Sequence, residues 1–196
     1  MTALRIHFEG DDLLAQDAIR SVVRDTYAGV RPTDAGVARR FYSPDELAGL
    51  PDESVDVVIS NGVVNLSPRK VRVLSEAFRI LRPGGRLAIV DLILEHDLPP
   101  EIQTLPAAWA GCLSGALSEI ALYKGLRRAG FRQVDIRPLD RFGIAECALY
   151  PLFGDELLAL LRRLVPAERH DQIATSVFVG ARKAARDEAL PGRARG

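Results

Sequence analysis

The feature that most constrains the fold is a strand-helix-strand unit between residues 55 and 94. Two compact apolar segments, VDVVIS (55–60) and RLAIVDLIL (86–94), flank a stretch whose apolar residues recur at helical spacing. A Pro-Gly-Gly turn at 83–85 is expected to end that helix. Because strands that are apolar almost throughout are covered on both faces, the unit predicts two parallel strands of an α/β sheet joined by a right-handed crossover.

The chain divides into three segments. Residues 1–50 are expected to form an N-terminal arm and helices, and 51–183 are expected to hold the main α/β unit. The tail 184–196 is rich in Arg, Ala and Gly, which predicts disorder. Beyond the first unit, the apolar patterns predict helices at 118–131 and 152–164 and strands at 133–139 and 173–183.

Charge and composition exclude several classes of function. The 196 residues carry 26 basic and 26 acidic side chains, so no overall charge favours nucleic acid or an anionic membrane as a partner. No long apolar run or secretory pattern occurs, which predicts a cytoplasmic protein. The two cysteines and three scattered histidines lack the spacing of a metal site, and no residue is predicted to be catalytic.

Two motifs carry a family resemblance. The run LPDESVDVVISNGVVNLSPRKVRVLSEAFRILRPGGRLAIVDLIL resembles the second half of class I S-adenosylmethionine-dependent methyltransferases. SNGVVNLSP together with PAAWAGCLSGALS is more specific, and it resembles the arsenite methyltransferases. The resemblance implies a Rossmann-like α/β sheet with helices on both faces and S-adenosylmethionine as cofactor.

The resemblance also implies a strand order. A complete fold of this family has the order 3-2-1-4-5-7-6, with the last pair antiparallel. Only the strands equivalent to 4-5-7-6 have counterparts here, so we expect a truncated sheet. The counterparts, in that order, are 55–60, 86–94, 173–183 and 133–139.

The resemblance suggests which residues form the site. Ser60, Asn61 and Gly62 follow a parallel strand, and in the family this turn borders the cofactor; the alternative is a tight Asn-Gly turn with no ligand. Trp109 and Cys112 lie in the segment that the family uses for its substrate, arsenite, through soft thiolates.

The thiols have an alternative interpretation as small buried apolar side chains. Trivalent arsenic needs two or three thiols, and Cys147 is the only possible companion of Cys112 in this sequence. Cys147 lies upstream of the region where the family places its second thiol, so arsenite is an open question as substrate.

The glycine-rich loop of the family is missing from the sequence. No G-x-G occurs, although such a loop lets the backbone approach the cofactor closely. A single LPDES at 50–54 stands where the family has two similar segments, which suggests an internal deletion. We therefore expect that ordinary cofactor binding is lost.

The truncation predicts an exposed sheet edge. Strand 55–60 is central in the complete fold and becomes an edge here, where an apolar strand is a template for pairing. It could be covered by the N-terminal segments or by the same strand of a second chain, and we expect a homodimer.

Three functions remain open from the sequence. The first is a non-catalytic binding or assembly module derived from an arsenite methyltransferase-like ancestor. The second is an active methyltransferase whose site is completed by dimerisation or a partner. The third is an unrelated small-molecule binder that uses the region of Trp109 and Cys112.

Overall fold

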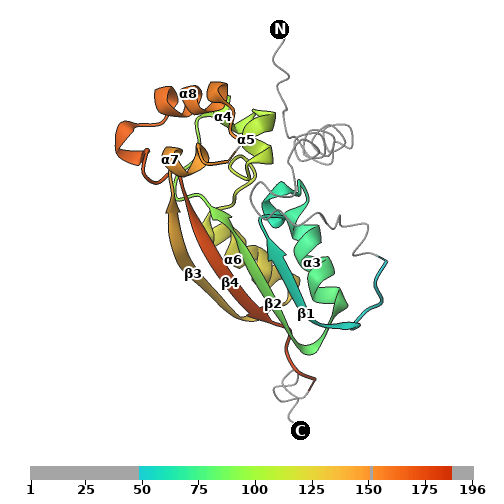
Figure 1. The fold of residues 1–196 in the computed structure, drawn as a ribbon. Coiled ribbons are helices and arrows are strands. Elements are labelled where there is room, and N and C mark those ends of the chain that lie inside the picture. Colours follow the sequence, from blue (N-terminus) through green and yellow to red (C-terminus); the bar gives the residue numbers. More distant parts are fainter. Residues whose placement is uncertain (1–48, 151, 187–196) are drawn as a thin grey trace.

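The described part of the chain is built on a four-stranded mixed sheet (Figure 1). The computed structural model describes residues 49–150 and 152–186. The strand order is β1-β2-β4-β3, which confirms the predicted truncated order. The strands are β1 (Val55–Asn61), β2 (Leu81–Ile93), β3 (Arg132–Phe142) and β4 (Ala174–Arg182). The predictions for the N-terminal arm and helices and for most of the tail lie outside the described residues.

Strand directions follow the predicted pattern. β1 runs parallel to β2, with Val58 opposite Leu87. β2 and β3 both run antiparallel to β4, so β4 occupies an interior position and β1 and β3 form the two edges of the described sheet. The parallel pair is joined by a helix, as the strand-helix-strand pattern predicts.

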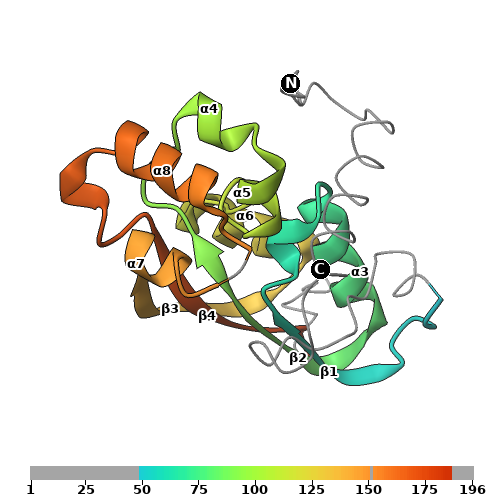
Figure 2. The ribbon, with the colours of Figure 1, turned by 45° about the horizontal axis from the view of Figure 1, so that its top comes forward.

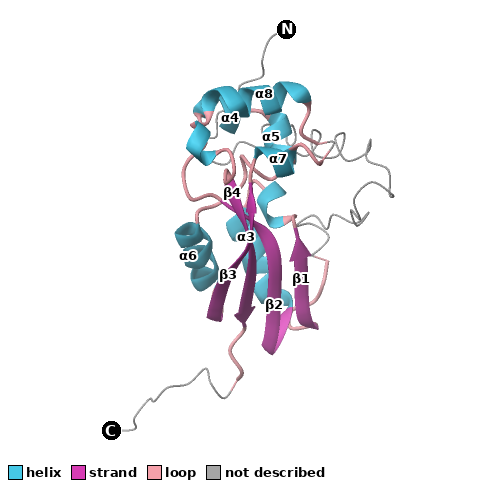
Figure 3. Cartoon of the chain, turned by 60° about the vertical axis from the view of Figure 1, so that its left-hand side comes forward, coloured by secondary structure: helices cyan, strands magenta, loops and turns pink. Residues whose placement is uncertain are grey.

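The helices form two groups. Figures 1 and 2 show the longer helices α3 and α6 on one side of the sheet, and Figure 3 shows α4, α5, α7 and α8 beyond one end of the strands. The α-helices are α3 (Lys70–Ile80), α4 (Pro100–Gln103), α5 (Pro106–Ala110), α6 (Glu119–Ala129), α7 (Ile144–Cys147) and α8 (Asp155–Leu164). Two short 3-10 helices, η1 (Val64–Leu66) and η2 (Ala167–Arg169), complete the set.

Each group of helices has its own apolar core. The first core joins α3 and α6 to the sheet, and Phe131 packs edge-on against Phe78 with ring centroids 5.2 Å apart. The second core lies among the helices at the strand ends and includes three buried leucines of α8, the helix predicted at 152–164. The described helices thus cover one face and one end of the sheet, and the helices predicted within 1–50 lie outside the described residues. On the other face Val57 and Ile59 are 41% and 78% exposed.

The Pro-Gly-Gly turn does not end the helix before it, contrary to the sequence prediction. α3 ends at Ile80, and the turn lies inside β2. Leu81 is already paired with Val55, and Gly84 donates its N–H to the Lys183 carbonyl at 2.9 Å. Pairing with two distant segments therefore ends the helix at Ile80, three residues before the Pro-Gly-Gly turn begins.

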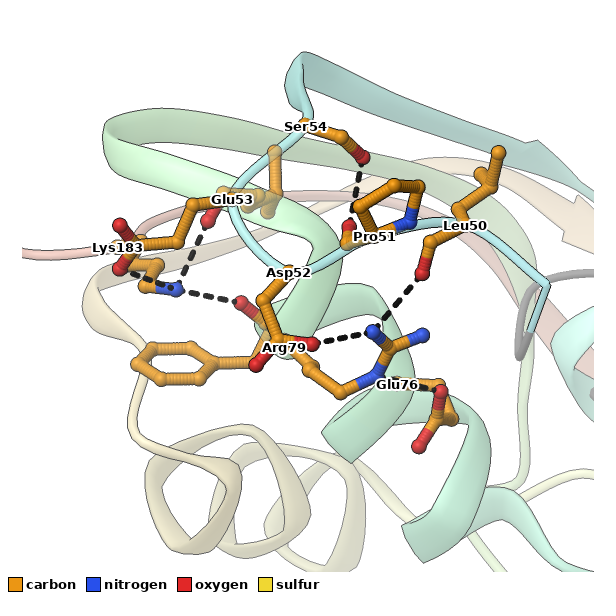
Figure 4. Close-up of polar contacts among 10 residues, drawn as sticks. Leu50, Pro51, Asp52, Glu53, Ser54, Glu76, Arg79 and Lys183 are labelled. Carbon is orange, nitrogen blue, oxygen red and sulfur yellow. Dashed lines mark hydrogen bonds and ion pairs between the residues drawn. The ribbon is translucent and has the colours of Figure 1, made fainter.

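The LPDES segment is anchored at the base of β1, as Figure 4 shows. Arg79 at the end of α3 donates to the Leu50 carbonyl at 2.9 Å and to the Asp52 carboxylate at 2.5 Å. The backbone N–H of Glu53 donates to the Arg79 carbonyl at 3.0 Å. Lys183 lies 3.5 Å from the Glu53 carboxylate and also donates to two carbonyls at the junction of α3 and β2. The segment is thus a fixed lead-in to β1.

None of the helices in residues 49–150 and 152–186 has the length and apolar character needed to cross a bilayer. The cytoplasmic location remains a prediction.

Candidate functional site

The Asn61-Gly62 turn lies at the carboxyl end of β1. Gly62 has a φ of +64°, a left-handed conformation that glycine adopts without strain, and its N–H donates to the Val90 carbonyl at 2.9 Å. Among the described residues, an added Cβ at Gly62 would meet no atom within 4 Å. Asn61 is exposed and Ser60 is half-buried. The turn is therefore accessible from outside at the edge where open α/β sheets bind ligands.

Trp109 lies on α5 and makes a hydrogen bond with η1, the segment that follows β1. Its indole Nε1 donates to the Leu66 carbonyl at 3.0 Å. The Lys70 ammonium lies 5.0 Å from the centre of the indole ring, within the range of a cation–π contact. Trp109 thus connects α5 to the start of α3, and its observed polar contacts are with the protein itself.

Cys112 contacts the turn directly. Its thiol donates to the Gly62 carbonyl with a sulfur-oxygen distance of 3.3 Å. The residue is 8% exposed and has a φ of +63°, which is strained for a side chain other than glycine. Burial raises the pKa of the thiol strongly, and the nearby Asp91 raises it further while Lys70 opposes both. The thiol is therefore protonated at neutral pH.

The contact between Cys112 and Gly62 joins the two predicted half-sites. The residues are 50 positions apart in the sequence, yet the structure places the predicted substrate segment against the predicted cofactor turn. Whether this region binds a cofactor or a substrate stays a prediction.

Cys147 has different neighbours. It is fully buried on α7 in the second core, with apolar residues of α4 and α8. Burial raises the pKa of its thiol to about 12. Cys112 belongs to neither apolar core, and among the described residues no group of three His, Cys, Asp or Glu side chains could hold a metal ion. The two thiols have no observed contact.

A buried polar network beneath the turn was not predicted. Asp91 on β2 is 6% exposed and accepts the backbone N–H groups of Asn65 at 3.1 Å and Leu92 at 2.9 Å. Asn65 in turn donates from its side chain to the Leu92 carbonyl at 2.6 Å. Burial raises the pKa of Asp91, and these hydrogen bonds oppose the rise. Asp91 therefore anchors η1 to β2 through the backbone of Asn65.

Lys70 supplies the positive charge of this network. Its ammonium donates to the Ser67 carbonyl at 2.8 Å. Burial lowers the pKa of Lys70 to about 8, and the nearby Asp91 and Cys112 act in the opposite direction. Lys70 is the first residue of α3, and no local sequence pattern distinguishes it from a solvent-exposed lysine at the start of a helix.

Gly115 allows the predicted substrate segment to approach η1. A Cβ there would lie 2.0 Å from the Asn65 carbonyl oxygen, a clash with backbone that side-chain movement cannot relieve. The glycine in GCLSG was the available signal, because an isolated glycine often marks a close backbone approach.

A methyltransferase-domain family model matches residues 41–137. The arsenite methyltransferase of Halobacterium salinarum is 47% identical over 97 residues, which are 48% of this chain and 25% of the relative. The arsenite methyltransferase of Aquipseudomonas alcaligenes is 35% identical over 151 residues, covering 74% of this chain and 43% of the relative. The chain thus spans less than half the length of these relatives.

The fold has a counterpart among solved structures. A Bacillus halodurans protein assigned as a methyltransferase superposes with a TM-score of 0.50 and 18% identity, over 70% of this chain and 73% of that chain. At this identity the likeness concerns the fold.

Proposed function

The chain belongs to the class I S-adenosylmethionine-dependent methyltransferases and is arsenite methyltransferase-like, and we propose that it is a non-catalytic binding or assembly module of that family. S-adenosylmethionine is the cofactor of the family. The proposal is that this chain, taken alone, has lost ordinary binding of that cofactor.

The observation that carries the proposal is the contact of Cys112 with Gly62. The thiol is buried, protonated and hydrogen-bonded to the carbonyl of the turn at 3.3 Å. A protonated thiol is neither an effective nucleophile nor a soft ligand, because both roles belong to the thiolate. The contact therefore uses in internal packing the thiol that a thiol-bound substrate would need, and it holds this thiol against the predicted cofactor turn.

The described residues fit only part of the cofactor. Asn61 and Gly62 offer an accessible turn that could contact one side of it. Asp91, at the end of the next strand, is buried and already accepts two backbone N–H groups, so it is not open to ribose hydroxyls. The sequence also has no G-x-G, the pattern whose backbone would approach the nucleotide closely.

Isothermal titration of the full chain with S-adenosylmethionine and S-adenosylhomocysteine tests the proposal. We expect no saturable heat for the wild-type chain. Cys112→Ala, which releases the Gly62 carbonyl, and Cys147→Ala, which removes a thiol of the second core, provide matched variants. Saturable binding at micromolar concentration with one cofactor per chain would overturn the proposal. Binding that appears only in Cys112→Ala would show that the contact closes the turn.

A second candidate is a methyltransferase completed by another chain. It is favoured by the contact of Cys112 with Gly62, because this contact joins the predicted substrate segment to the predicted cofactor turn. Methyl transfer depends mainly on holding the donor in line with the acceptor, so a second chain could supply the missing positioning groups. Its substrate would be arsenite or a small thiol, with Trp109, Cys112 and Cys147 as the residues to test.

Transfer of a labelled methyl group distinguishes the two candidates. The chain is incubated with labelled S-adenosylmethionine and either arsenite or glutathione, at concentrations high enough for self-association. Turnover that disappears in Cys112→Ala but persists in Cys147→Ala would support the second candidate and reject the first. Absence of turnover in a folded, associated chain supports the first.

A further inference from the structure

One side of β1 has unpaired backbone groups in the described part of the chain. β1 is the end strand of the order β1-β2-β4-β3 and pairs only with β2 there. Gly62 donates its N–H to Val90 on β2. Because successive residues of a strand point their N–H and C=O groups to opposite sides, those of Val57, Ile59 and Asn61 point away from β2. The edge thus offers regularly spaced donors and acceptors.

The same residues carry exposed apolar side chains. Val57 and Ile59 are 41% and 78% exposed, and because strand side chains alternate they lie on the face opposite Val58, which is the face that α3 and α6 leave open in Figures 1 and 2. Val58, between them, packs against the first core. An edge strand with exposed apolar side chains is a template for another strand, and the one charged residue of β1, Asp56, is ion-paired with Arg82 of β2 at 2.8 Å.

We propose that β1 pairs antiparallel with β1 of a second copy of this chain, about a twofold axis at Val58. In this register Val57 lies opposite the partner's Ile59, and Val55 lies opposite the partner's Asn61. The residues whose backbone groups face outward then meet one another, so each such pair exchanges two hydrogen bonds. The two sheets become one continuous eight-stranded sheet, from four described strands in each copy.

The sequence of β1 favours self-pairing in this register over self-pairing in the neighbouring registers. An axis at Val58 pairs all seven residues of the strand, and any other axis leaves some unpaired. A shift by one residue places outward backbone groups against inward ones. An axis at Asp56 would place two carboxylates directly opposite, which is destabilising, whereas the axis at Val58 places each Asp56 opposite the partner's Ser60.

The pairing goes beyond the proposed function because it brings a second copy to the candidate site. Antiparallel strands run in opposite directions, so the carboxyl end of β1 lies beside the start of the partner strand. The anchored lead-in that precedes the partner's Val55 therefore comes next to the Asn61-Gly62 turn. The interface and the turn share one edge.

Sedimentation velocity of the full chain tests the association. We expect a dimer at tens of micromolar, and we expect Ile59→Lys to be a monomer with an unchanged circular dichroism spectrum. Ile120→Lys is the matched control, because Ile120 is 68% exposed on α6, away from the edge. A wild-type monomer would overturn the proposal, as would a dimer that survives Ile59→Lys.

Disulfide trapping tests the register in a background with Cys112→Ala and Cys147→Ala. Across the axis, the two Val58 residues form a non-hydrogen-bonded pair with Cα atoms about 4.5 Å apart, within disulfide range. The two Ile59 residues are offset by two positions and exceed the limit of about 7 Å. We expect Val58→Cys to form a covalent dimer and Ile59→Cys not to; the reverse result would reject this register.

Discussion

The two edges of the described sheet are built in opposite ways. At the β3 edge most side chains are exposed and many are charged, and the pairing with β4 is interrupted by register shifts on both sides of Pro138. At the β1 edge the exposed side chains include Val57 and Ile59, and pairing with β2 is regular from Val57 to Asn61. Both strands end the same sheet, so position alone does not explain the difference.

β3 has several features that discourage pairing with another chain. Pro138 lacks an N–H group, and Gln133 has a φ of +48° next to a register shift. Arg137 forms an ion pair with Asp135 at 2.9 Å and lies 4.9 Å from the ring of Phe178. Proline, charge and irregular pairing are the devices by which natural sheets protect an edge.

β1 has less of such protection within the described residues: Asp56 is exposed and ion-paired with Arg82, and the pairing with β2 shifts between Val55 and Val57. From Val57 to Asn61 its pairing is regular, and most of its residues are typical of an interior strand. The comparison shows that β3 has the sequence of an edge strand, whereas β1 has the sequence of a strand that normally pairs on both sides. The experiments below test what holds each edge in place and what each edge permits, beginning with the largest expected effect.

The β3 edge should depend on a buried anchor and not on its exposed side chains. Phe131 directly precedes β3, is fully buried and packs against Phe78. Phe131→Ala should lower the free energy of unfolding by about 3–5 kcal/mol, because it removes a large core side chain and leaves a cavity. Leu139→Ala, at a β3 residue that is 51% exposed, should change it by less than about 1 kcal/mol. Similar effects of both substitutions in urea unfolding would contradict this view of the edge.

Beyond the β1 edge lies the half-buried ammonium of Lys70, whereas the charged side chains of β3 that we describe are exposed. Burial lowers the pKa of Lys70 from 10.5 to about 8. Between these values the unfolded chain binds more protons than the folded chain, so stability rises with pH; below pH 8 the buried charge is destabilising. Because Lys70 is only half-buried, we expect a gain on the order of 1–2 kcal/mol over this range.

Lys70→Met isolates this contribution. Between pH 8 and pH 10.5, the unfolding free energy of the wild type should rise relative to that of Lys70→Met. Urea unfolding of both proteins at each pH measures this difference. Subtracting the variant removes the titration of the other side chains. A difference that stays constant with pH would mean that the ammonium is solvated in the folded state.

Local patterns and family resemblance predicted the order of the strands, but long-range contacts determined the details of the site. The apolar runs at 55–60 and 86–94 were sufficient to identify β1 and β2. The contact of Asn65 with Asp91 spans 26 positions, and that of Cys112 with Gly62 spans 50, so no local pattern reveals them. For the same reason, pairing of Leu81 with Val55 shortened α3 despite the later glycines.

The smallest expected effect concerns the charges of β3. Replacing both Asp135 and Arg137 by Thr removes an ion pair whose side chains are 58% and 64% exposed. Exposed pairs contribute roughly 0.2–1 kcal/mol, and Thr suits a strand, so stability should change by less than about 1 kcal/mol. Pro138 and the register shifts remain, so the sedimentation coefficient should also be unchanged. A larger sedimentation coefficient for this variant would show that charge alone keeps the β3 edge from pairing with another chain. In that case a charge at Ile59 should protect β1 in the same way. An unchanged sedimentation coefficient would show that Pro138 and the irregular backbone pairing protect β3.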